Sequence, residues 1–201
     1  MKTALIEGPV GHIEIATRPA SGDIWAVLCH PHPQFGGSMY DLVIERMASA
    51  YAEHDVNCLL FNFRGVGASA GRHDHGAGEA DDLRTIVAWL RDTHHPRETW
   101  LAGYSWGSHV AWKVASTDPG IKRLTLVAPV VDSLEYDGDV AAATHIVVGS
   151  TDDFVSVESI EKWANGRYPV NVIEGADHFF AGSREMVTDT ISAAIKKSPL
   201  R

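Results

Sequence analysis

Residues 103–107, Gly-Tyr-Ser-Trp-Gly, lie between the apolar run 100–102 and the helix-like stretch 108–116. A serine between two glycines at a strand-to-helix corner marks a tight turn, in which the serine backbone is strained and flanking side chains would clash. Glycine at both flanks removes that clash. The serine hydroxyl then projects from the sheet edge, and the N–H groups that open the next helix point toward it. The segment therefore predicts a strand–turn–helix unit that presents Ser105 as a nucleophile.

The pattern G-x-S-x-G occurs twice in this chain, because residues 67–71, Gly-Ala-Ser-Ala-Gly, also match it. The context of this second match is different. The apolar strand before it, residues 59–63, has already ended, and the residues after it, Arg-His-Asp-His-Gly, do not begin a helix. Because the motif depends on its strand–turn–helix setting, Ser105 rather than Ser69 is the predicted nucleophile.

The size and composition of the chain are those of an ordinary globule, and we expect one domain over residues 1–201. A net charge of −9 argues against nucleic acid as a partner. Residues 1–7 lack the apolar core of a signal peptide, and no segment reaches membrane-spanning length, so we expect a cytoplasmic protein without a membrane partner. Cys29 and Cys58 lie in apolar runs and are expected to be free thiols. The sequence carries no signal for the oligomeric state.

Apolar strand candidates alternate with helical candidates along the whole chain. The predicted strands cover residues 3–7, 12–17, 25–30, 57–63, 99–104, 123–128, 145–149 and 168–174. The predicted helices cover residues 39–53, 79–91, 108–116, 157–164 and 183–196. Such alternation implies a mostly parallel sheet with helices on both faces. Because ligands of these sheets bind beyond the carboxyl ends of the strands, we expect the chemistry in the loops that follow the strands.

A serine hydroxyl needs a general base, and the base usually needs a carboxylate that fixes its tautomer. In this architecture the expected chain order is serine, acid, histidine. His178, in the loop after the last predicted strand, is the candidate base. His109 is expected one helical turn below Ser105, and His145 at the opposite end of the sheet. Other histidines are expected at the surface or in loops: His12, His54, His73, His75, His94 and His95.

Two adjacent carboxylates compete for the role of the acid in the loop after the strand at residues 145–149. Asp152 lies three residues after Gly149 and three before Val155, which is the usual spacing of the acid in such a loop, so we predict Asp152 as the acid and Asp153 as a solvated loop residue. Asp177 is a weaker candidate, because the side chains of neighbouring residues seldom meet, and its expected role is to shape the turn before His178.

An oxyanion hole requires two donors aimed at the developing negative charge. The backbone N–H of Trp106, which follows the nucleophile, is the first candidate. The second is expected in residues 30–37, His-Pro-His-Pro-Gln-Phe-Gly-Gly, where the two prolines have no N–H and leave His32 between them. Gln34 or the glycine pair is the alternative. His30 and His32 alternate like zinc ligands, but no third ligand is spaced to join them, so we expect neither a metal nor a cofactor.

Taken together, these motifs resemble the α/β-hydrolase superfamily, in particular small capless hydrolases with an H-P-H-P-x-x-G-G oxyanion loop. The resemblance rests on residues 30–37, 61–69, 76–79, 103–107, 149–152 and 175–180. It implies an α/β-hydrolase fold with a mostly parallel sheet of about eight strands, a Ser105–Asp152–His178 triad and a structural role for Ser69. Only about fifteen residues separate Pro129 from His145, where cap domains usually enter. We therefore expect no cap domain and an open site.

The expected function is hydrolysis of small carboxylic esters through an acyl-enzyme intermediate. A thioesterase or acyl transferase with the same triad, and a non-catalytic binding protein on this fold, are the alternatives. Phe35 and Phe179 are the candidate residues of the substrate pocket, although the aromatic residues near the site are equally compatible with core packing. An open site predicts a preference for short acyl chains.

Overall fold

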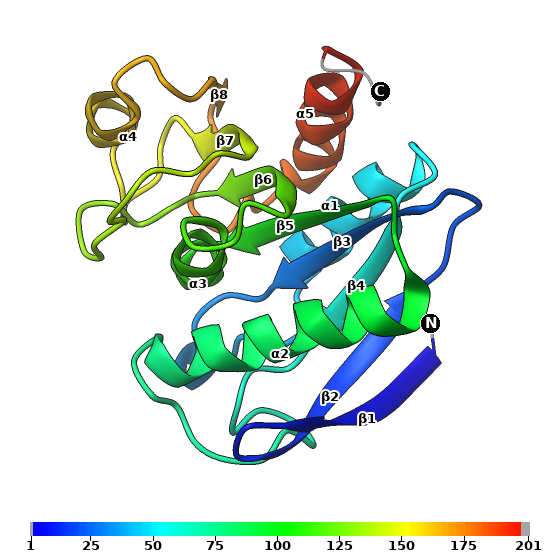
Figure 1. Ribbon diagram of the computed structural model, residues 1–201. Helices are drawn as coiled ribbons and strands as arrows, with labels where there is room; N and C mark the ends of the chain where they lie inside the picture. The colour runs from blue at the N-terminus through cyan, green and yellow to red at the C-terminus, as the bar shows by residue number, and fades with distance from the viewer. Residues whose placement is uncertain (1, 198–201) are drawn as a thin grey trace.

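The computed structural model describes residues 2–197, in which eight strands form one twisted sheet (Figure 1). The strands lie in the order β1-β2-β4-β3-β5-β6-β7-β8. Their bounds are β1 (Lys2–Gly8), β2 (Gly11–Arg18), β3 (Ile24–Cys29), β4 (Asn57–Phe61), β5 (Glu98–Tyr104), β6 (Ile121–Val127), β7 (Ala143–Gly149) and β8 (Val170–Ile173). β2 pairs antiparallel with β1 and with β4, and all other neighbours are parallel. The predicted fold class is confirmed.

Five α-helices within residues 2–197 cover the two faces of the sheet (Figure 1). They are α1 (Leu42–Ala52), α2 (Ala77–His94), α3 (Trp106–Ala115), α4 (Val157–Ala164) and α5 (Arg184–Lys197). α1 and α5 pack on one face with one buried cluster, whereas α2, α3 and α4 pack on the other face with a second cluster. Because both faces are covered, all six residues of the central strand β3 are buried, which explains its continuous apolar sequence.

No cap domain is inserted in this sheet. Residues 128–142, which connect β6 to β7, form turns and contain neither a helix nor a strand. The carboxyl ends of the parallel strands therefore remain uncovered by a separate element. Among residues 2–197, no helix is both long and apolar enough to cross a membrane.

Two helices begin at residues other than the predicted ones because a side chain caps the backbone. The helix predicted from residue 39 begins at Leu42, because the carboxylate of Asp41 accepts hydrogen bonds from the N–H groups of Val43 and Ile44. The helix predicted from residue 79 begins at Ala77 instead. There the carboxylate of Glu79 accepts the N–H of Gly76, so the residue predicted to start the helix lies inside its first turn.

Candidate active site

Ser105 lies at the corner between β5 and α3 with φ +52° and ψ −122°. A positive φ is uncommon for a residue other than glycine and stores backbone strain. The turn is held by a hydrogen bond from the Ser105 N–H to the carbonyl of Val127, at 2.8 Å. The predicted strand–turn–helix geometry is therefore confirmed, and α3 starts immediately after the serine.

The two glycines of this turn are needed because backbones meet there. A Cβ atom on Gly103 would lie 2.4 Å from the carbonyl oxygen of Gly107. A Cβ atom on Gly107 would lie 2.3 Å from the carbonyl oxygens of both Cys29 and His30. Since these obstacles are backbone atoms, no rotamer change relieves them. The first turn of α3 thus packs directly against the end of β3.

The structure brings the side chains of Ser105, His178 and Asp152 together, each from a loop after a different parallel strand. His178 Nε2 lies 2.9 Å from Ser105 Oγ, and His178 Nδ1 lies 2.7 Å from Asp152 Oδ2. Both the histidine and the aspartate side chains are buried. The ring therefore presents one nitrogen to the carboxylate and the other to the hydroxyl, which is the geometry that a serine–base–acid relay requires.

The three candidate carboxylates have different surroundings. While Asp152 Oδ2 faces His178, its Oδ1 accepts the N–H groups of Phe154 at 2.8 Å and Val155 at 3.1 Å. Asp153 is exposed. Asp177 Oδ1 accepts the N–H of Ala181 and so stabilises the turn around His178. Of these three carboxylates, Asp152 is the one in hydrogen-bond contact with the histidine.

A second hydrogen bond fixes the main chain at His178. The hydroxyl of Tyr104, the residue before Ser105, donates a hydrogen bond to the carbonyl oxygen of His178 at 3.0 Å. Burial raises the pKa of Tyr104, so its hydroxyl keeps the proton that it donates. This bond joins the serine loop to the histidine loop independently of the contact between their side chains.

The loop that follows β3 is fixed by His30. Its Nδ1 donates to the carbonyl of Pro31 at 2.7 Å, and its Nε2 accepts the N–H of Phe63 at 3.0 Å. Burial lowers the pKa of His30 to about 4, so the ring is neutral near pH 7 and can accept at one nitrogen while donating at the other. Through these two hydrogen bonds His30 bridges the loop after β3 and the backbone of Phe63. Residues 2–197 contain no group of three or more His, Cys, Asp or Glu side chains that could hold a metal ion.

His32 and Trp106 line the same pocket as Ser105, and their rings lie 5.2 Å apart. Trp106 is the first residue of α3, so its N–H has no partner within the helix. In the part of the chain described by the structure, the N–H of His32 donates no hydrogen bond to another protein group. The carbonyl of His32, by contrast, accepts the N–H groups of Phe35 and Gly37, both at 3.1 Å. This turn orders the loop while it leaves the His32 N–H available to a ligand.

The serine opens into a pocket of about 830 Å³ with a mostly apolar lining. Phe35 and Phe179 both line it and are 86% and 55% exposed, so they belong to the pocket and not to the core. Trp106 and Phe180 are buried. Ligand pockets commonly have volumes of about 300–1,000 Å³, far more than an acetyl group requires. The volume of the pocket does not test the preference for short acyl chains, which stays a prediction.

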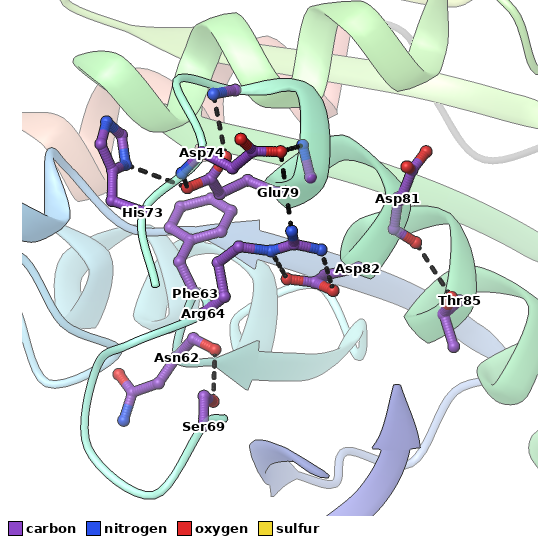
Figure 2. A network of polar contacts seen from close by, with 12 residues as sticks. Asn62, Phe63, Arg64, Ser69, His73, Asp74, Glu79, Asp81, Asp82 and Thr85 are labelled. Carbon is purple, nitrogen blue, oxygen red and sulfur yellow. Dashed lines mark hydrogen bonds and ion pairs between the residues drawn. The ribbon is translucent and has the colours of Figure 1, made fainter. Parts of the chain in front are cut away.

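Several residues that line the pocket were not predicted, among them Phe154 and His73. Phe154, two residues after Asp152, lines the pocket beside His178, and its place in the acid loop was the signal that could have revealed it. His73 was expected among surface or loop residues, yet its loop side chain is largely buried and lines the pocket. Its Nδ1 lies 2.9 Å from Oε1 of the buried Glu79, which keeps the ring turned inward (Figure 2). No local pattern in the sequence reveals that pairing.

The second G-x-S-x-G segment contributes Ser69 to the polar contacts shown in Figure 2. The buried Ser69 hydroxyl donates to the carbonyl of Asn62 at 2.6 Å and accepts the N–H of Glu14 at 2.9 Å. Beside it, Arg64 makes two hydrogen bonds to the carboxylate of Asp82, at 2.7 and 2.8 Å. Ser69 is thus hydrogen-bonded to backbone groups on both sides.

Comparisons with known proteins agree with this architecture. The model of the alpha/beta hydrolase fold family matches residues 27–157. An uncharacterized protein of Rickettsia prowazekii is 27% identical over 208 residues, covering 96% of this chain and 87% of that protein.

Two solved structures are similar over nearly their whole length. One is an alpha-beta serine hydrolase homologue from Coxiella burnetii, with 33% identity, a TM-score of 0.92, and coverage of 96% of this chain and 97% of that chain. The other is a Xanthomonas campestris α/β serine hydrolase described as having no lid, with 28% identity, a TM-score of 0.92, and coverage of 100% of this chain and 96% of that chain. The chain belongs to the alpha/beta hydrolase fold family.

Proposed function

We propose that this protein is a serine hydrolase that cleaves small carboxylic esters through an acyl-enzyme intermediate. The observation that carries the proposal is the continuous contact from Asp152 Oδ2 through His178 to Ser105 Oγ, at 2.7 and 2.9 Å, within a ligand-sized pocket. Similarity to the serine hydrolase homologue from Coxiella burnetii and to the serine hydrolase from Xanthomonas campestris supports the same class of reaction.

In the first half of the reaction, Ser105 Oγ attacks the ester carbonyl carbon while His178 Nε2 accepts the hydroxyl proton. The resulting imidazolium is stabilised by Asp152, whose Oδ2 faces Nδ1. The same contact fixes the starting tautomer, because it holds the proton on Nδ1 and leaves the Nε2 lone pair facing the serine. Since the carboxylate is buried, its attraction to the imidazolium is screened less than it would be in water.

The negative charge that develops on the carbonyl oxygen requires donors. In this proposal the N–H groups of Trp106 and His32 supply them, and the amino-terminal end of α3 adds a favourable potential. Collapse of the tetrahedral intermediate then breaks the bond to the alcohol, and His178 gives its proton to the leaving alkoxide oxygen. Water, deprotonated by the same histidine, attacks the acyl-enzyme and releases the carboxylic acid.

The test compares Asp152→Asn with the matched control Asp153→Asn on 4-nitrophenyl acetate. Loss of the Asp152 charge should lower kcat by about 10³–10⁴-fold, because the histidine loses its fixed tautomer and its counter-charge. Asp153→Asn should change kcat less than about twofold, since that side chain is exposed. A larger loss from Asp153→Asn would reverse the assignment. Absence of turnover on esters and on the matching thioesters by the folded wild-type protein would favour a binding protein instead.

A further inference from the structure

Two phenylalanines flank the imidazole of His178 on the pocket side. The ring of Phe154 lies 4.5 Å from the His178 ring at an interplanar angle of 37°, and that of Phe179 lies 5.5 Å away at 89°. Both phenylalanines line the pocket, yet they are 56% and 55% exposed. Large apolar side chains that stay exposed inside a pocket are places where a ligand buries its own apolar surface.

These rings are carried by ordered backbone. The N–H of Phe154 donates to Asp152 Oδ1, while Oδ2 of the same carboxylate contacts His178. Phe179 lies between His178 and the fully buried Phe180, whose N–H donates to the carbonyl of Asp177. The carboxylate that orients the imidazole therefore also positions one ring of the pair. Such preorganisation reduces the ordering that a ligand must otherwise impose when it binds.

The two rings form a corner. Their centroids are 5.7 Å apart and their planes meet at 85°, so one ring presents its edge to the face of the other. Aromatic rings favour edge-to-face and offset-stacked contacts, because the face of each ring is negative and its edge positive. A third, planar ring placed in this corner can make an offset-stacked contact with one phenylalanine and an edge contact with the other. A puckered aliphatic ring of similar volume lacks the charge distribution that such contacts use.

The position of this corner indicates which half of the substrate it meets. In acyl transfer the histidine that accepted the serine proton returns it to the leaving oxygen, so the leaving alcohol lies next to that histidine. The proposed oxyanion donors belong to Trp106 and His32, whose rings contact each other, whereas the rings of Phe154 and Phe179 contact that of His178. Given the proposed function, the group bound between Phe154 and Phe179 is therefore the alcohol half of the ester.

We propose that the preferred substrates are esters of aryl-bearing alcohols, with the aryl group bound in the corner formed by Phe154 and Phe179. The acyl half occupies the remainder of the pocket and is not selected by this corner. The two phenylalanines are specificity-determining residues for the proposed reaction.

The test uses 2-phenylethyl acetate and 2-cyclohexylethyl acetate, followed by proton release. The two esters have the same acyl group and similarly placed six-membered rings, so they differ mainly in planarity and ring electrostatics. The expected kcat/KM is about three- to tenfold higher for the phenyl ester, in line with the usual contribution of an aromatic pair. The reversed pair, ethyl 3-phenylpropanoate and ethyl 3-cyclohexylpropanoate, should differ less than about twofold, because there the ring is in the acyl half.

Phe154→Leu and Phe179→Leu should each reduce the phenyl-to-cyclohexyl ratio toward one. The ratio within one variant is independent of how much of that variant is folded and active. Tyr40→Leu is the matched control, because Tyr40 is 55% exposed but does not line the pocket, and it should keep the wild-type ratio. A wild-type ratio near one, an unchanged ratio in both phenylalanine variants, or a larger ratio in the reversed pair would overturn this inference.

Failure of the inference and failure of the proposed function are distinguishable. Hydrolysis of ethyl acetate, which has no ring, should disappear in Ser105→Ala whatever the aryl preference. Retention of that activity would overturn the proposed function itself. Hydrolysis that depends on Ser105 but shows no aryl preference would overturn only the role of Phe154 and Phe179.

Discussion

The two G-x-S-x-G segments of this chain share a five-residue pattern but have different structural environments. Ser105 has a positive φ, and its hydroxyl lies 2.9 Å from a histidine inside a pocket. Ser69 is buried, and its hydroxyl is already hydrogen-bonded to the backbone of Asn62 and Glu14. The difference lies in what surrounds the pentapeptide. The strand before Ser105 and the helix after it leave the Ser105 hydroxyl accessible. The Ser69 hydroxyl lies in a loop and makes hydrogen bonds to the backbone instead.

The glycines of the two segments differ in the same way. In the first segment, Gly107 packs against carbonyl oxygens of the β3 end, which cannot rotate away. In the second, a Cβ atom on Gly71 would meet first a methyl group of Val10, at 2.8 Å, which belongs to a side chain that can move. Gly71 is instead required for its φ of +85°. One glycine serves close backbone packing and the other serves a turn.

The largest expected difference between the segments is in turnover. Ser105→Ala should lower kcat on 4-nitrophenyl acetate by about 10³–10⁶-fold, because the attacking oxygen is lost. Ser69→Ala should stay within a few-fold of the wild type, as its hydroxyl is hydrogen-bonded to the backbone. Steady-state kinetics on both purified variants measure this directly, and near-wild-type activity of Ser105→Ala would remove the distinction between the two serines.

The next difference is in stability and concerns the glycines. Gly107→Ala should lower the free energy of unfolding by about 3–5 kcal/mol, because its Cβ overlaps backbone oxygens on two residues. Gly71→Ala should cost about 1–2 kcal/mol, the strain of a left-handed residue with a Cβ atom. Urea unfolding monitored by tryptophan fluorescence compares them. Equal losses of unfolding free energy in the two variants would mean that close backbone packing at Gly107 does not set it apart from Gly71.

Acid should weaken the contact by which His30 joins the loop after β3 to Phe63, at the start of the loop that carries Ser69. Its pKa of about 4 in the fold is below the ordinary value of 6.5, so the unfolded chain binds the proton more readily. The contribution of His30 is therefore complete above pH 6.5 and is lost as the pH falls toward 4.

Between pH 7 and pH 4, the unfolding free energy of the wild type should fall by about 3 kcal/mol more than that of His30→Gln, which cannot titrate. The comparison isolates His30 from the buried His109 and the half-buried His145, whose pKa values are also lowered to about 4 by desolvation. If the unfolding free energies of the two proteins fell equally between pH 7 and pH 4, His30 would take no part in the acid sensitivity.

The smallest expected effect is the loss of stability in Ser69→Ala. Removal of the hydroxyl leaves the Glu14 N–H and one acceptor position of the Asn62 carbonyl without their partner, which should cost about 1–2 kcal/mol. In urea unfolding, the midpoint should fall while the dependence of the unfolding free energy on urea concentration stays unchanged. A midpoint equal to that of the wild type would mean that water replaces the hydroxyl at no cost.

The parts of the site that follow from chain order could be predicted from the sequence. The serine, the acid loop and the late histidine each follow a strand, and parallel strands bring their carboxyl ends to one edge of the sheet. Phe154 and His73 were not predicted, because a loop position alone does not show that a side chain turns into the pocket, where the Phe154 ring meets His178 and His73 Nδ1 lies near the buried Glu79. The start of α1 was missed because the Asp41 cap fixes it, and α3 begins two residues before its predicted start without a side-chain cap.

The measurement that tests the central claim most directly is the site of covalent labelling by a fluorophosphonate. This reagent reacts with an activated serine, so it reports which hydroxyl has a base beside it and donors for the oxyanion. Peptide mapping by mass spectrometry should find the adduct on Ser105 and none on Ser69, and Ser105→Ala should remain unlabelled. An adduct on Ser69, or no adduct on folded wild-type protein, would contradict the assignment of Ser105 as the nucleophile.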